Sequence, residues 1–261
     1  MDMKKKEIID HIVTWLSEYS KKSGTNGFVV GISGGIDSAL TSTLCALTGR
    51  PVIVLSMPIR QHHSEYDRGL EHIEWLKKNF KNVSSDVVDL TPVFEKLESD
   101  LPKDVLDFLT MANTRARLRM LTLYAFAGNK KMLVAGTGNK IEDFGVGFFT
   151  KYGDGGVDIS PIADLVKSQV FALAKELGVV ESILTAKPTD GLFHDGRSDE
   201  DQLGATYDEL EWAMDAIEEK IDPETFTPRQ KEAMKIYLER NRANQHKMEA
   251  IPVCKIPKEL F

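Results

Sequence analysis

The stretch GISGGIDSAL, residues 31–40, lies where an apolar run ends and a helical pattern begins. A turn rich in glycine and serine at such a place points several backbone N–H groups toward one spot, and the N-terminus of the following helix adds partial positive charge. The common nucleotide-binding loop ends in Gly-Lys-Ser/Thr, whereas this turn contains no lysine. The sequence therefore predicts a phosphate site held mostly by backbone, with Ser33 and Ser38 as hydroxyl donors.

Asp37 is the unexpected residue of this turn, because a carboxylate repels a phosphate bound beside it. A divalent cation between the two groups removes the conflict, and Mg²⁺ commonly bridges carboxylate and phosphate oxygens. The alternative is that Asp37 only favours the N-terminus of the helix electrostatically. The turn alone leaves both interpretations open.

Strands alternate with helices along the chain. Four short apolar runs have the length of buried strands, namely residues 28–32, 52–57, 83–88 and 132–135. Helical periodicity covers residues 2–22, 36–49, 64–80, 104–127 and 161–177, with two more helices after 200. This alternation predicts an α/β fold, a doubly wound parallel sheet with helices on both faces. We expect a single domain over residues 1–261, with a helical C-terminal extension from about residue 200.

Two local signals refine this prediction. Ser160 and Pro161 have the pattern of an N-cap followed by proline at the first helical position, and Gly178 that of the residue just past a helix end. Ligands of such sheets bind at the carboxyl ends of the strands, where the strand order reverses. The loops 31–38, 56–63 and 136–143 are therefore expected to form the site.

Composition excludes several classes of protein. The net charge of −7 does not favour a nucleic-acid-binding surface. The two cysteines, Cys45 and Cys254, form no CxxC pair, so zinc and redox motifs are absent. The N-terminal residues have no signal-peptide core, and no apolar run reaches about 18 residues. We expect a cytoplasmic protein.

Further motifs point to one enzyme family. SGGIDS, residues 33–38, resembles the signature of the ATP pyrophosphatases, which cleave ATP between the α- and β-phosphates to adenylate a substrate. Six further segments resemble, in order, those of the ammonia-dependent NAD⁺ synthetase family: MPIRQ (57–61), NTRARLRM (113–120), residues 134–178, KPTDGL (187–192), DEDQLGATYDELE (199–211) and NQHKMEAIPV (244–253). The resemblance implies a fold like that of the adenine nucleotide α-hydrolases. It also implies an ATP-dependent, amide-forming ligase that adenylates the nicotinate carboxylate of deamido-NAD⁺ and then releases AMP with ammonia.

The resemblance assigns roles to individual residues. It implies ATP contacts from Gly31, Ile32, Ser33, Gly34, Gly35, Ile36, Asp37, Ser38, Thr137, Lys167 and Thr189. It implies deamido-NAD⁺ contacts from Arg117, Lys151, Asp158, His246 and Lys247. Asp37 and Glu142 would bind Mg²⁺, Asp37 and Lys167 would be catalytic, and Asp154 would help to recruit ammonia. A solvated loop glutamate is the alternative for Glu142.

Some residues are interpreted differently from pattern alone. Lys167 is expected on a helix flank, where a lysine usually extends to water; the resemblance assigns it to phosphate. Arg115 and Arg119 face away from Arg117 on the predicted helix, so we expect surface or interface charges there. Residues 185–201 form a long loop without periodicity. Matching family segments close over the nucleotide as a lid, which would exclude water from the adenylate.

Partners and rival functions remain to be weighed. The resemblance covers nearly the whole chain without a glutaminase domain, and neither cysteine is near a plausible base, so free ammonia or a partner amidase is expected. The family also implies a homodimer with the dinucleotide partly at the interface. One rival is a related synthetase that makes GMP or a thiolated tRNA base, although the expected catalytic cysteines, basic RNA face and GMP-type dimerisation segment are not found. The other is a non-catalytic sensor that binds ATP through the same loop.

Overall fold

Four parallel strands form the sheet in the computed structural model, which describes residues 3–61, 63–186 and 199–261. The strands are β1 (Phe28–Gly31), β2 (Val52–Ser56), β3 (Val83–Val87) and β4 (Leu133–Val134), in the order β3-β2-β1-β4. Phe28 lies opposite both Val52 and Leu133 in the register. The four predicted strands are confirmed, each one or two residues shorter than expected.

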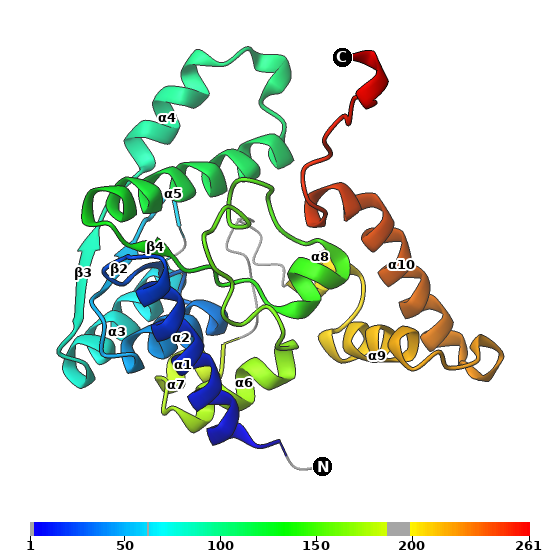
Figure 1. The fold of residues 1–261 in the computed structure, drawn as a ribbon, viewed down its shortest axis with the longest axis horizontal. Helices are drawn as coiled ribbons and strands as arrows, with labels where there is room; N and C mark the ends of the chain where they lie inside the picture. The colour runs from blue at the N-terminus through cyan, green and yellow to red at the C-terminus, as the bar shows by residue number, and fades with distance from the viewer. Residues whose placement is uncertain (1–2, 62, 187–198) are drawn as a thin grey trace.

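Helices cover both faces of this sheet, as predicted (Figure 1). One face packs against α1 (Lys5–Lys22), α2 (Ile36–Leu47), α3 (His63–Asn79), α6 (Lys167–Glu176) and the short α7 (Glu181–Leu184). The other packs against α4 (Thr91–Asp100) and α5 (Phe108–Lys130). Side chains alternate along a strand, so Phe28 and Val30 enter the first core and Val29 the second. Both faces of β1 and β2 are therefore apolar, which explains their continuous apolar runs. The edge strand β3 has the sequence VSSDV and is not buried, so the expectation of a buried strand over 83–88 is wrong in that respect.

A third apolar core lies outside the sheet. It joins a π-helix, Lys140–Val146, to α8 (Asp199–Leu203), α9 (Tyr207–Glu218) and α10 (Pro228–Met248). Ile141, Leu203 and Leu210 are buried in it. Figure 1 shows α9 and α10 at one side of the molecule, with the C-terminal segment extending beyond α10. Single 3₁₀ turns lie at Lys103–Val105, Pro223–Thr225 and Lys258–Leu260.

Two local predictions need correction. The helix expected from residue 161 begins at Lys167, so Ser160 and Pro161 do not cap it; residues 161–165 form turns instead. Tertiary contacts outweigh the local signal, because Ile162 and Leu165 are buried in the first core and the Leu165 carbonyl accepts a hydrogen bond from Lys140 N at 2.9 Å. The helix expected over 104–127 begins at Phe108, where Asp107 accepts from Thr110 N, and it continues to Lys130. The helix α4 and the π-helix were not predicted.

Other predictions hold. Gly178 follows the end of α6 with φ +71°, as its sequence position indicated. The strand order reverses between β1 and β4, and the loops 31–38 and 136–143 leave the carboxyl ends of these two strands. The predicted switch point of the sheet is thereby confirmed, and the binding of a ligand there stays a prediction.

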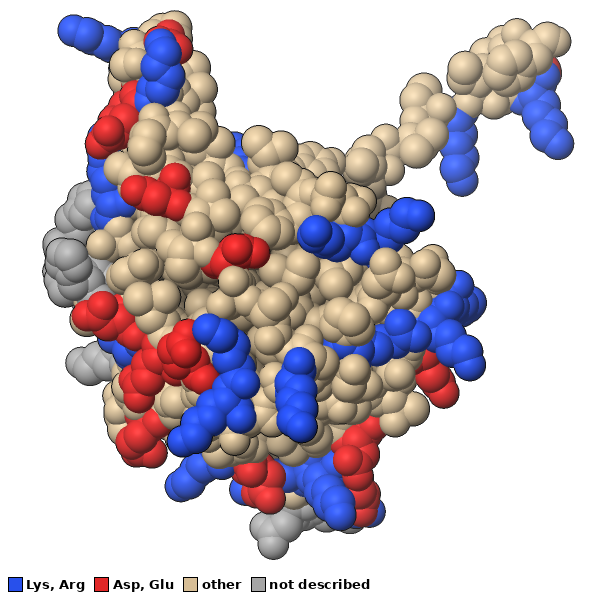
Figure 2. Space-filling view, turned by 90° about the vertical axis from the view of Figure 1, so that its left-hand side faces the viewer, with Lys and Arg blue, Asp and Glu red and all other residues tan. Residues whose placement is uncertain are grey.

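The surface and the helices agree with the composition. Acidic and basic side chains are interspersed on the face shown in Figure 2, and no extended basic surface covers it. Within the described ranges, every helix is too short or too polar to cross a membrane.

Candidate active site

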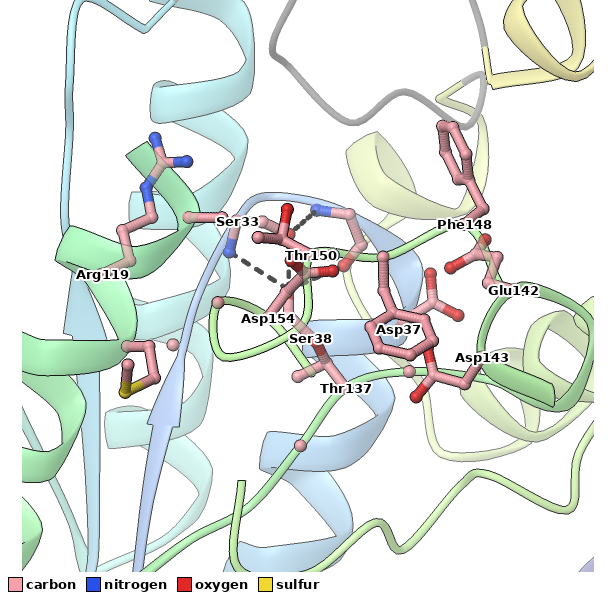
Figure 3. A pocket seen from close by; sticks show the side chains of 18 of the residues that line it. Ser33, Asp37, Ser38, Arg119, Thr137, Glu142, Asp143, Phe148, Thr150 and Asp154 are labelled. Atoms are coloured by element: carbon pink, nitrogen blue, oxygen red, sulfur yellow. Dashed lines mark hydrogen bonds between the residues drawn. The ribbon is translucent and has the colours of Figure 1, made fainter. Parts of the chain in front are cut away.

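A cavity of about 700 Å³ opens at the carboxyl ends of β1, β2 and β4. It collects residues from the glycine loop, from α5 and from residues 135–157 (Figure 3). Residues from the start of α6 and from the end of α10 also line it. The predicted site residues that line it are Gly31, Ile32, Ser33, Gly34, Gly35, Ile36, Asp37, Ser38, Arg117, Thr137, Glu142, Lys151, Asp154, Lys167, His246 and Lys247. Asp158 is not among its lining residues. Thr189 and most of the predicted lid lie outside the described residues.

The glycine loop is held by its own serines. The hydroxyl oxygens of Ser33 and Ser38 are 3.1 Å apart, and Gly35 N donates to Ser33 Oγ at 3.1 Å. Gly34 has φ +86°, and a Cβ there would lie 2.3 Å from the backbone oxygen of Glu65 in α3. Glycine is thus required at this position by backbone conformation and by the approach of α3, in addition to any ligand. The N–H groups of the first turn of α2 have no partner within the helix, and such groups are suited to bind an anion.

Lys167 joins the two predicted metal-binding acids. Its Nζ lies 2.6 Å from Asp37 Oδ2 and 2.9 Å from Glu142 Oε1. The side chain of Lys167 is only 5% exposed, and those of the acids 16% and 17%. Lys167 therefore does not extend to water, as a lysine on a helix flank usually does, and its predicted contact with phosphate stays a prediction. Because α6 begins at this residue, its side chain is directed into the cavity, where a buried ammonium finds the anionic partners that it needs.

Two neutral donors hold the same carboxylates, and sequence reasoning found neither. Asn139 Nδ2 donates to Asp37 Oδ1 at 3.0 Å, and its side-chain oxygen accepts from Glu142 N at 3.1 Å. Tyr207 OH donates to Glu142 Oε1 at 2.5 Å, while Lys167 Nζ lies 4.9 Å from the centre of the Tyr207 ring. Both residues lie within segments that resemble the family, which was the only available signal. The carboxylates are thus fixed independently of Lys167.

Burial and charge shift the pKa values of this cluster. Burial raises the pKa of Asp37, which the nearby Lys167 only partly opposes. Burial acts in the same direction on Glu142, but Lys167 and Tyr207 outweigh it and lower the pKa of that carboxyl. Burial alone would lower the pKa of Lys167; the two acids raise it, so the ammonium stays charged. The neighbouring Asp143, another cavity residue missed from sequence, has a pKa raised well above its usual range by burial and by Glu142.

The two acids fit a nucleotide-bound Mg²⁺. Oxygens of Asp37 and Glu142 already converge on one cation, the Lys167 ammonium. Neither in the cavity nor in the rest of the described residues do three or more His, Cys, Asp or Glu side chains lie so that they could hold a metal. Mg²⁺ usually takes one or two protein carboxylates and completes its shell with phosphate oxygens and water. The donor set therefore suits a metal that arrives with phosphate.

Basic side chains gather at the other end of the cavity. Lys151 Nζ donates to the backbone oxygen of His246 at 2.6 Å, and Lys247 Nζ donates to that of Phe149 at 2.7 Å and to that of Gly147. Arg117 donates to the backbone oxygen of Lys151 at 3.4 Å. These bonds join α5, the loop after the π-helix and the end of α10, which are far apart in the sequence. The cations are placed by carbonyl groups, and their charge is available to an anionic ligand.

Two acids predicted in this part of the chain have different surroundings. Asp154 lines the cavity, and its Oδ1 accepts from Thr150 N at 3.0 Å within a tight turn. Asp158 Oδ2 accepts from Val134 N at 2.8 Å, and its Oδ1 accepts from Tyr124 OH at 3.0 Å. The carboxylate of Asp158 thus holds the edge of the sheet. Its contact with the dinucleotide remains a prediction.

Arg115 is buried, so the prediction of a surface or interface charge is wrong for it; Arg119 is half-buried. Arg119 lines the cavity and donates from Nε to the backbone oxygen of Met57 at 3.1 Å. Burial, with a smaller effect of Arg115, lowers the pKa of Arg119 to about 10. Arg115 is buried with its guanidinium 5.3 Å from the centre of the Phe94 ring. The unpredicted helix α4 supplies Phe94, which explains why the pattern of α5 alone placed Arg115 outside.

Neither cysteine takes part in the cavity. Cys45 is buried in α2, and burial raises the pKa of its thiol. Cys254 is exposed in the C-terminal segment. A thiolate nucleophile needs a lowered pKa and access to its substrate, so the cavity contains no candidate for one among its described residues.

Comparison with known proteins identifies the family. The NAD synthase family model matches residues 8–251. An NH₃-dependent NAD⁺ synthetase from Alkaliphilus metalliredigens is 40% identical over 227 residues, 83% of this chain and 87% of that protein. The corresponding protein of Methanosarcina mazei is 36% identical over 94% of this chain and 96% of its own.

Solved structures agree. An NMN synthetase from Francisella tularensis superposes with a TM-score of 0.84 at 33% identity, covering 98% of this chain and 100% of that one. An NH₃-dependent NAD synthetase from Campylobacter jejuni superposes with a TM-score of 0.79 at 26% identity, covering 97% and 100%. The glycine loop, the paired acids and the basic end of the cavity thus lie in a fold and a sequence shared with these enzymes, and the chain belongs to the NAD synthase family.

Proposed function

We propose that the chain is an ammonia-dependent NAD⁺ synthetase. It would use ATP to adenylate the nicotinate carboxylate of deamido-NAD⁺ and would then form the amide with ammonia. The observation that carries this proposal is the arrangement of one cavity, which joins a phosphate-binding loop and two converging acids to a separate cluster of cations. A protein that only senses ATP does not need the cluster of cations at the basic end of the cavity.

The first step activates a poor electrophile. An oxygen of the nicotinate carboxylate attacks the α-phosphorus of ATP, the bond from that phosphorus to the bridging oxygen breaks, and pyrophosphate leaves. Ammonia then attacks the acyl carbon, the carbon–oxygen bond to AMP breaks, and the nitrogen loses one proton to give the amide. Neither step requires a covalent intermediate with the protein.

The residues of the chain align the reactants and bind charge. The N–H groups at the start of α2 and the Lys167 ammonium bind phosphate oxygens of ATP. Asp37 and Glu142 would hold Mg²⁺, which would supply positive charge for the phosphates of ATP. Arg117, Lys151, His246 and Lys247 hold the dinucleotide, and Asp154 helps to recruit ammonia beside the acyl carbon.

The assay follows both products. Purified protein is given ATP, MgCl₂, ammonium and deamido-NAD⁺, and AMP and NAD⁺ are quantified together. We expect equal amounts of the two products, and none when either ammonium or deamido-NAD⁺ is left out. ATP binding without AMP release would support the sensor instead. Robust turnover with glutamine as the only nitrogen source would contradict the assignment of free ammonia as nitrogen donor.

A second candidate substrate is nicotinate mononucleotide. It is favoured by the structural match to the Francisella tularensis NMN synthetase, at a TM-score of 0.84. The reacting carboxylate is the same in both substrates, so the chemistry above is unchanged; only the AMP half of the dinucleotide differs. Comparing kcat/KM for the two acids decides between them: a ratio above about tenfold, or 1.4 kcal/mol, in either direction assigns the substrate.

We also propose that the protein acts as a homodimer in the cytoplasm. Support for the dimer comes from apolar side chains exposed on α5, namely Phe108, Leu109 and Leu121. Apolar groups concentrated on one helix are typical of interaction surfaces. Sedimentation equilibrium at several concentrations tests the dimer, and a single monomer mass at the working concentration of the assay would exclude it.

A further inference from the structure

Lys167 occupies the place between the two acids that a metal would need. Its Nζ is within hydrogen-bond distance of both Asp37 and Glu142, at 2.6 and 2.9 Å. Mg²⁺ binds oxygen ligands at about 2.0–2.1 Å, so an ion that takes the same two oxygens as the ammonium, Asp37 Oδ2 and Glu142 Oε1, must lie close to the same point. Ammonium and metal cannot occupy that point together.

The displaced ammonium would have a high energy unless it found another anion. Lys167 is 4% exposed, and breaking a buried ion pair by removing one partner is strongly unfavourable. Among the described residues, Lys167 forms ion pairs with these two acids alone. A phosphate group bound at the adjacent start of α2 would provide the new partner.

The acids themselves would not need to move. Asn139 holds Asp37 through its other oxygen, Oδ1, and Tyr207 holds Glu142. Neither bond depends on the ammonium. The site would therefore keep its shape when Lys167 leaves and when a cation enters.

We propose that Lys167 blocks the metal site of the ligand-free protein, so that a divalent cation binds tightly only when a phosphate ligand draws Lys167 away from Asp37 and Glu142. The inference rests on the proposed function for the identity of that ligand, ATP. It makes metal and nucleotide binding interdependent. It also explains why two acids are enough to bind the cation without a third, because phosphate oxygens supply further ligands whenever the cation is bound.

The test measures Mn²⁺ binding in the absence of any nucleotide. Mn²⁺ affinity is determined by electron paramagnetic resonance for the wild type and for Lys167→Met. The wild type should bind Mn²⁺ weakly, and the variant at least about tenfold more tightly, because the acids lose their ammonium. Adding Glu142→Gln to Lys167→Met should abolish the gain, which places the bound ion at this site.

A matched control separates the site from general loss of positive charge. Lys140 lies on the same π-helix as Glu142 and pairs with Glu218 at 3.1 Å, away from the acids. Lys140→Met removes one positive charge as well, and should leave Mn²⁺ affinity within about twofold of the wild type. Circular dichroism checks folding of each variant, and Lys167→Gln serves as a second replacement.

The outcomes are distinct. Variants of Lys167 that need Mn²⁺ to fold would support the proposal as well, since the metal then replaces the ammonium. Mn²⁺ affinity equal to that of the wild type in both Lys167 variants, or failure of both to fold at saturating Mn²⁺, would overturn it. The Mn²⁺ measurement contains no substrate, so its result does not depend on the activity assay. A protein that is fully active on deamido-NAD⁺ can still show unchanged Mn²⁺ affinity in the Lys167 variants and so contradict the inference. A protein that is inactive on deamido-NAD⁺ can still be tested in the same way.

Discussion

The two ends of the cavity hold their charges in opposite ways. At the acidic end, Asp37 and Glu142 are paired with Lys167 and are largely buried. At the basic end, Lys151 and Lys247 donate to backbone oxygens, and neither makes an ion pair within the described ranges. The two carboxylates of the acidic end therefore share one ammonium without ligand, whereas the cations of the basic end have no acidic partner among the described residues and attract anions. The difference indicates that Lys167 exchanges its acidic partners for a ligand at the acidic end, whereas the basic end binds an anionic ligand without breaking an ion pair.

The largest effect is expected from Asp37→Asn, which removes one negative charge from the acidic end. The variant leaves Lys167 with one acid and the metal with one carboxylate. We expect kcat/KM to fall at least about 1,000-fold, or roughly 4 kcal/mol, measured as AMP and NAD⁺ formed together. Asp10→Asn on the exposed face of α1 is the matched control. Wild-type turnover in Asp37→Asn would contradict the role of the acidic end in the reaction.

Lys247→Met tests the basic end. The ammonium of Lys247 is half-buried beside Phe149, so its loss should weaken capture of the dinucleotide. We expect KM for deamido-NAD⁺ to rise about tenfold or more, with KM for ATP within about twofold. Lys235→Met, on the exposed face of the same helix, should change neither. An equal rise in both KM values would show that the two ends do not act separately.

Tyr207→Phe sharpens the account of the acidic end. It removes the hydroxyl that donates to Glu142 but keeps the ring. Loss of one hydrogen bond to a charged group is worth about 1.5–3 kcal/mol, so kcat/KM should fall about tenfold to 100-fold. The apparent Mg²⁺ requirement should rise with it. Unchanged Mg²⁺ dependence would mean that Tyr207 does not position Glu142.

The smallest effect is expected from salt. Arg117 and His246 at the basic end are exposed, and ions screen exposed charges more than buried ones. Raising KCl from about 50 to about 300 mM should increase KM for deamido-NAD⁺ about fivefold and KM for ATP about twofold. Steady-state rates at fixed Mg²⁺ measure both. A larger effect on ATP would contradict the assignment of the two ends.

Much of the fold was predictable because the central strands β1 and β2 are buried on both faces. They are continuous apolar runs, such as 52–57, and the strands alternate with helical patterns. The strand-order rule then located the loops 31–38 and 136–143. Local signals failed where tertiary contacts decided: Ser160 and Pro161 look like a helix start, but the burial of Ile162 and Leu165 moves that start to Lys167.

Within the site, the residues found were those that belong to motifs. The resemblance supplied Asp37, Glu142 and Lys167, yet no pattern showed that the lysine would lie between the acids. Asn139 and Tyr207 were missed because their partners are 102 and 65 residues away in the chain. Arg119 was missed because periodicity shows which residues share a helix face but not which neighbour that face will meet.

The most direct measurement is a crystal structure with Mn²⁺ and a non-hydrolysable ATP analogue, with the metal located by its anomalous signal. We predict one Mn²⁺ bound to both Asp37 and Glu142, with Lys167 Nζ moved from these acids to a phosphate oxygen. A bound nucleotide with Lys167 still between the two carboxylates, and Mn²⁺ on neither of them, would contradict the account.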